Sequence, residues 1–148
     1  MKYIQIGEKT IGIDEYRTQL FYDKKDVVNK ICPCDYCQNY VYCCNRFPSE
    51  LNKLFKELCI NPEKANEVME FFEDSRKKHL YASFYLVVGK VIKMIPENET
   101  IIDLTNEVSR LKKQNIIFDV SDVIFIKTNQ KISPLIQVYL EISLPWVL

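Results

Sequence analysis

The chain has 148 residues, with 20 lysines and arginines against 20 aspartates and glutamates, so its formal net charge is zero. This length supports one domain, residues 1–148, and zero net charge argues against a protein whose main task is to coat nucleic acid or an anionic membrane. Three glycines without a GxGxxG or GxxxxGK[ST] pattern exclude a phosphate-binding glycine loop, and one histidine excludes sites that need two.

The amino-terminal section predicts strands. From Lys2 to Phe21 we expect two strands, separated by a short turn at 7–9. The second begins in the apolar stretch at 10–13, and apolar residues recur at 19–22.

The middle of the chain predicts helices. Asp35 followed by Gln38 is typical of a helix N-cap with its N3 partner. One face of this first helix carries Cys37, Tyr40, Val41 and Cys44. A second helix is expected to begin at Pro48, and its apolar stripe consists of Leu51, Leu54, Phe55 and Leu58.

A third helical segment is expected from Asn61 and Pro62 through Phe72, although residues 62–65 also fit a structured loop. Its helical spacing gathers acidic residues on one face: Glu63, Glu67, Glu70 and Glu73. A basic stretch at 76–78 then reverses the sign of the charge. This face is either a solvated helix surface or a docking surface for a protein partner.

The second half of the chain again predicts strands. Residues 80–92 are apolar on both faces, which is typical of a central strand, and Gly89 indicates a bulge or a close backbone approach. One or two strands are expected over 116–127, and 136–144 alternates strictly between apolar and polar residues. Residues 106–115 fit a short helix.

Helices in the middle and strands at both ends predict an α+β fold rather than an α/β fold. We expect a single domain whose antiparallel sheet is built from both chain ends. A helical insertion is expected in the first half, at about 35–72.

The six cysteines include one pair with metal-ligand spacing. Cys34 and Cys37 form a CxxC motif, in which two thiolates reach one tetrahedral zinc ion. A complete site needs two more ligands, and the candidates are Cys32, Cys43, Cys59 and His79.

Two other interpretations of this pair remain open. A CxxC at a helix N-terminus is also typical of a redox dithiol, because the helix dipole lowers the thiol pKa. Asp35 between the two cysteines opposes this, and no βαβ unit is evident around them. In the third interpretation, Cys37 and Cys44 pack in the core while Cys32 and Cys34 line a turn.

The sequence predicts a cytoplasmic protein. No signal peptide is evident at the amino terminus, and the longest charge-free apolar segment, 80–89, has about half the length that spans a bilayer. In a reducing compartment, most of the cysteines are expected to be buried small hydrophobic residues.

Four segments carry a resemblance. Residues 34–40, CDYCQNY, resemble the CxxCxN[FY] segment of a family of small uncharacterised bacterial proteins, mostly from Firmicutes. The closing LPWVL at 144–148, the stretch LCINPEK at 58–64 and the strand YLVVG at 85–89 are similar to segments of the same family. The chain has Leu86 where the family often has histidine, which weakens the case for a catalytic histidine.

The resemblance implies no activity. We therefore expect a non-enzymatic protein-interaction module of the immunity or accessory type, with the acidic face as the candidate contact surface and no nucleic-acid or membrane partner. The alternative is a thiol site at Cys34 and Cys37 that binds zinc or performs redox chemistry. Trp146 on the closing strand is expected to anchor one end of the core.

Overall fold

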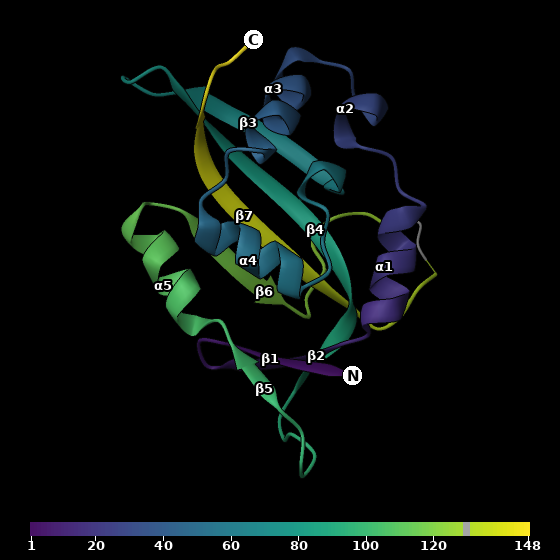
Figure 1. Ribbon diagram of the computed structural model, residues 1–148. Coiled ribbons are helices and arrows are strands. Elements are labelled where there is room, and N and C mark those ends of the chain that lie inside the picture. The colour runs from purple at the N-terminus through teal and green to yellow at the C-terminus, as the bar shows by residue number, and fades with distance from the viewer. Residues whose placement is uncertain (129–130) are drawn as a thin grey trace.

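The computed structural model describes residues 1–128 and 131–148 and confirms the α+β fold (Figure 1). The strands are β1 (Lys2–Ile6), β2 (Lys9–Ile13), β3 (Glu67–Glu73), β4 (Lys78–Ile92), β5 (Ile101–Asp103), β6 (Ile117–Ser121) and β7 (Leu135–Pro145). The helices are α1 (Glu15–Asp23), α2 (Val28–Ile31), α3 (Asp35–Cys44), α4 (Ser49–Glu57), the short 3-10 helix η1 (Pro62–Lys64) and α5 (Thr105–Lys113).

The described strands form one mixed sheet in the order β5-β1-β2-β4-β7-β6, and β3 pairs with β4 outside this path. Strand β4 is central, because β7 pairs along one of its edges while β3 and β2 share the other. These pairings are antiparallel, as are β1 with β2 and β6 with β7, whereas β1 and β5 are parallel. The prediction of an antiparallel sheet from both chain ends is confirmed, with one parallel pair added.

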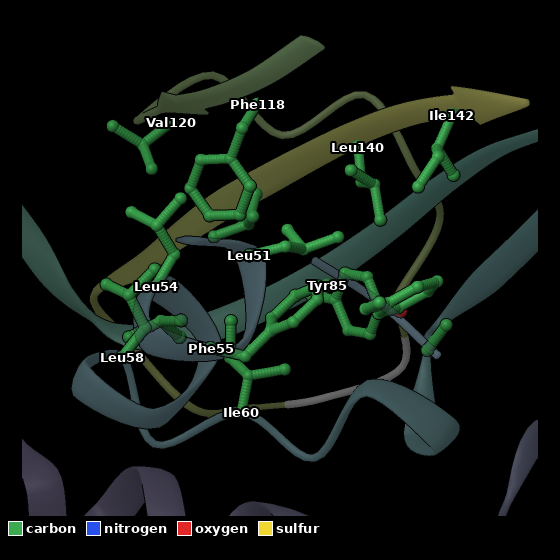
Figure 2. Packing of buried hydrophobic residues seen from close by; sticks show 14 of the residues in the cluster. Leu51, Leu54, Phe55, Leu58, Ile60, Tyr85, Phe118, Val120, Leu140 and Ile142 are labelled. Atoms are coloured by element: carbon green, nitrogen blue, oxygen red, sulfur yellow. The ribbon is translucent and has the colours of Figure 1, made fainter. Parts of the chain in front are cut away.

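The core lies between this sheet and the helices of the first half. The predicted stripe of α4 is at most 2% exposed and consists of Leu51, Leu54, Phe55 and Leu58. Figure 2 shows these side chains directed toward Phe118 and Val120 of β6 and Leu140 of β7. The alternation predicted for the closing strand is therefore confirmed, because its apolar residues are buried and form part of the sheet face against which α4 packs.

The expected strand residues at 19–22 belong instead to helix α1, so this prediction is wrong. The side chain of Asp14 accepts a hydrogen bond from the backbone N–H of Arg17 and caps the helix. The buried side of α1 carries Thr18, Phe21 and Tyr22, which follow helical spacing. The cap and this spacing outweigh the strand propensity of a short apolar run.

The third helix expected through Phe72 is also wrong. Asn61 caps a helical turn as expected, because its side chain accepts from the N–H of Glu63, but this turn ends at Lys64. Residues Glu67–Glu73 form β3, which pairs with β4 from Glu67 opposite Phe84 onward. The edge of β4 pairs with this segment from Glu67 to Glu73, and this tertiary pairing outweighs the helical spacing of the local sequence.

Three smaller expectations have clear outcomes. The short helix expected within 106–115 is α5, and the strand expected from 116 is β6, which ends at Ser121. Gly89 marks a close backbone approach, because a Cβ atom there would collide with the carbonyl oxygen of Gly12 in β2.

Candidate metal centre

Three cysteine sulfurs come together at the corner between α2 and α3. Cys32 directly follows α2, Cys34 is the N-cap of α3, and Cys37 lies in the first turn of α3. Their Sγ atoms all lie within 4.8 Å of one another, and those of Cys32 and Cys34 are 3.4 Å apart. The structure thus adds Cys32 to the CxxC pair, whereas the sequence alone offered it only as a further candidate.

The amino end of α3 holds two of these sulfurs in place. The sequence indicated Asp35 as the N-cap, but the structure shows Cys34 in that role, with an extended backbone and a sulfur that accepts from the N–H of Cys37 at 3.5 Å. Asp35 is the first helical residue, where a carboxylate suits the helix dipole. Gln38 donates its side-chain amide to the carbonyl of Pro33 at 2.9 Å and so fixes the entry to the helix.

The spacing of the sulfurs suits a tetrahedral metal ion. A zinc ion with Zn–S bonds of about 2.3 Å holds its sulfurs about 3.8 Å apart. The separations here, from 3.4 Å to at most 4.8 Å, include that value. Within the described residues, no carboxylate, histidine or further cysteine joins the group. Three sulfur atoms of the described chain could therefore hold a metal ion, and two of them, those of Cys32 and Cys34, are exposed.

The thiols differ in acidity. The pKa of Cys34 is lowered, chiefly because the backbone N–H of Cys37 donates to its sulfur. Burial, together with the contacts with Cys34 and Cys32, raises the pKa of Cys37 to about 12. Thiolate character is therefore concentrated on exposed Cys34, and Cys37 carries its proton at neutral pH.

The other candidate sulfurs lie outside this group. Cys59 follows α4 and is half-buried there. Cys43 and Cys44 are buried, and their Sγ atoms donate to the backbone oxygens of Pro145 at 3.5 Å and Pro62 at 3.6 Å. Cys44 is buried, as expected for a core residue. Cys43 is buried as well.

His79 contacts a carboxylate and aromatic rings and lies outside the sulfur group. Its Nδ1 atom lies 3.3 Å from Oε1 of Glu70, and the centroid of its ring lies 4.8 Å from that of Trp146. The ring of Tyr36, next to Cys37 in the chain, lies 5.7 Å from that of Trp146. Trp146 follows the end of β7 and is 36% exposed, so it does not anchor the core as expected; its ring instead contacts Tyr36 at the amino end of α3.

Asn39 ties the carboxyl-terminal segment to α3, and sequence reasoning missed it. Its side-chain amide donates to the carbonyl of Pro145 at 3.0 Å, and its oxygen accepts from the N–H of Val147 at 2.8 Å. The amide also lies 3.3 Å from the hydroxyl of Tyr81, and the residue is fully buried. The sequence held one indication of this role, because Asn39 is a polar residue next to the apolar stripe of the predicted helix.

We expect Asn39→Ala to lower the free energy of unfolding by about 1–3 kcal/mol, because it removes a fully buried amide and its two hydrogen bonds to the backbone of Pro145 and Val147. Trp146 is the single tryptophan, so urea unfolding followed by its fluorescence and by circular dichroism measures the loss. Asn45→Ala at the exposed end of the same helix is the control, with an expected change within about 0.5 kcal/mol. Equal stability of the two variants would contradict the role of Asn39.

The acidic residues do not share one helical face. Glu67, Glu70 and Glu73 lie on β3, and the odd spacing of Glu67 and Glu70 directs them to opposite faces of the strand. Glu70 faces His79, and Glu63 belongs to the separate turn η1. The helical acidic face is therefore wrong, and a protein partner stays a prediction without that surface.

Comparison of the chain with models of protein families, with curated proteins and with solved structures gives no match. Across the described residues, none of the helices combines the length and the apolar character that crossing a bilayer requires.

Proposed function

We propose that this protein binds one zinc ion through the thiolates of Cys32, Cys34 and Cys37. The observation that supports the proposal is the convergence of three Sγ atoms within 4.8 Å at the exposed corner between two helices. Thiolates are soft ligands that favour zinc over magnesium or calcium. The ion would join the end of α2 to the start of α3, so its role is structural and the protein is a zinc-binding module.

The proposed ion also accounts for the unequal thiols. Cys34 is already acidified by a backbone N–H, whereas Cys37 keeps its proton until a cation replaces it. The site takes two ligands from the start of one helix and a third from the end of the preceding helix. The three donors are therefore separated by only a few residues of chain. Such a site loses little conformational entropy when it binds the ion.

A second candidate function is thiol–disulfide exchange, and the same difference in acidity favours it. The Cys34 thiolate would attack a disulfide of a partner protein, forming a mixed disulfide and releasing one partner thiolate. The Cys37 thiol would pass its proton to the released partner thiolate, and its sulfur would attack Sγ of Cys34 and displace the second partner sulfur as a thiolate. Cys34 and Cys37 would end as a disulfide, and the partner would leave reduced by two electrons.

Cys32→Ser separates the two functions, because zinc binding uses three sulfurs and exchange uses only Cys34 and Cys37. We expect zinc affinity to fall at least about tenfold in this variant, measured by competition with a coloured chelator under reducing conditions. Cys59→Ser, which removes a half-buried cysteine outside the group, is the matched control and should bind as the wild type does. Unchanged affinity in Cys32→Ser would contradict the three-sulfur site.

A further inference from the structure

A hollow of about 390 Å³ lies at the end of β7, and none of the three clustered cysteines lines it. Strand β7 continues to Pro145, whereas its neighbour β6 begins opposite Glu141, so the last residues of β7 have one open edge. Three loops surround this edge: the α3–α4 loop, the β3–β4 turn and the loop after α5. The β3–β4 turn and the loop after α5 both lie on the left side of the molecule in Figure 1.

Positive charge gathers around the hollow. Arg46, Arg76 and Lys78 line it, and no carboxylate belongs to its lining. Among the described residues, none of these three side chains forms an ion pair, in contrast to Lys2 and Lys53, which do. Unpaired cations from separate segments that converge on one concave space produce a field that attracts an anion.

The turn that carries two of these cations is well defined. Oδ1 of Asp74 accepts from the backbone N–H groups of Arg76 at 2.8 Å and Lys78 at 3.0 Å, and Lys77 adopts a left-handed conformation with φ of 59°. These hydrogen bonds, together with attraction to the charges of Arg76 and Lys78, lower the pKa of Asp74. This carboxylate is therefore occupied by the backbone, and it orders the turn that presents Arg76 and Lys78.

Polar groups line the opposite wall. Asn115 ends α5 in a left-handed conformation, with φ of 61°, and the N–H of Ile116 returns to the carbonyl of Leu111 at 2.9 Å. This cap directs Gln114 and Asn115 into the lining. The side-chain amide of Gln114 also donates to Oε2 of Glu50 at 3.4 Å.

The amino end of α4 opens onto the same hollow. Pro48, the N-cap of this helix, belongs to the lining and offers no side-chain cap. The first N–H groups of a helix carry a partial positive charge. Its first turn also carries Glu50, whose carboxylate offsets this partial charge, so the field in the hollow comes from the two arginines and the lysine.

We propose that this hollow, lined by Arg46, Arg76 and Lys78, binds a phosphate group. Three cations around one space match the charge of a dianion better than they match the single charge of a carboxylate. The two guanidinium groups offer forked donors that fit phosphate oxygens, while Lys78 adds a point charge. The group is either free inorganic phosphate or the phosphate of a small phosphomonoester, since both present the same charged oxygens.

The test is a titration followed by amide NMR signals at constant ionic strength, with inorganic phosphate and phenyl phosphate as separate probes. Saturable shifts are expected for residues in 46–48, 76–78 and 114–116. The double variant Arg46→Gln/Arg76→Gln should weaken binding at least about tenfold. The control Lys112→Gln/Lys113→Gln removes two cations of α5 that lie outside the lining and should leave affinity within about twofold.

The two probes identify the source of the phosphate group. Tighter binding of phenyl phosphate supports recognition of a phosphomonoester, and equal binding supports recognition of the inorganic ion. The proposal is overturned if neither probe gives saturable shifts, or if Arg46→Gln/Arg76→Gln binds as tightly as the wild type. Equal losses of affinity in the arginine variant and the control variant would show that only the overall charge of the protein matters, and this result would also overturn the proposal.

Discussion

Alanine in place of Gly89 is expected to lower the free energy of unfolding by about 3 kcal/mol. A Cβ atom at this position would collide with the carbonyl oxygen of Gly12 and lie 3.0 Å from Cα of Ile13. Both obstacles are backbone atoms, so no side-chain rotation relieves them. Strands β2 and β4 would have to separate where Ile13 pairs with Gly89, which is the junction that joins the amino-terminal strands to the rest of the sheet.

Gly12→Ala is the matched control for this prediction. A Cβ atom there meets only the sulfur of Met1 at 3.0 Å and the ring of Tyr3 at 3.3 Å, and the end of the Met1 side chain is able to move. We expect a clearly smaller loss of stability than in Gly89→Ala, measured by urea denaturation of both variants. Equal losses would mean that the approach of the two backbones does not decide the cost.

The parts of the fold that the sequence predicted well are those with strong periodicity. The stripe of α4 and the alternation of β7 each bury one whole face, and no other secondary structure places those apolar residues on one side. Strand β4 was predictable for a related reason, because it is apolar on both faces and is covered along both edges.

The errors fall where local and tertiary effects compete. In β3, the glutamates at 67, 70 and 73 repeat every three residues and imitate the polar face of a helix. The neighbouring apolar residues, such as Val68 and Phe72, suit a strand equally well. The free edge of β4 decides between the two, and that edge exists only in the folded chain.

The candidate sites also combine features that local sequence predicts with features that depend on tertiary folding. The CxxC spacing of Cys34 and Cys37 is visible in the sequence, because both lie in one helical turn. The approach of Cys32 depends on the corner at Pro33, and the raised pKa of Cys37 depends on burial by distant elements. The basic hollow was not predictable, since Arg46 and Arg76 come from loops that only tertiary folding brings together.

Loss of zinc binding is the largest functional effect we expect from substitution at the sulfur group. Cys34→Ser/Cys37→Ser removes two of the three donors and leaves an oxygen at the N-cap position, where serine is a favoured residue. Cys37 belongs to the core cluster, but serine has nearly the same volume as cysteine, so the double variant should keep the circular dichroism spectrum of the wild type. A loss of metal in a folded variant is then a property of the site.

The central claim is therefore tested most directly by the zinc content of the folded protein. Protein purified without added metal, then incubated with excess zinc under reducing conditions and freed of unbound ions, should contain about one zinc per chain by elemental analysis. The folded Cys34→Ser/Cys37→Ser variant should contain none after the same treatment. A wild-type chain that stays metal-free, or a double variant that retains the same zinc, would contradict the account.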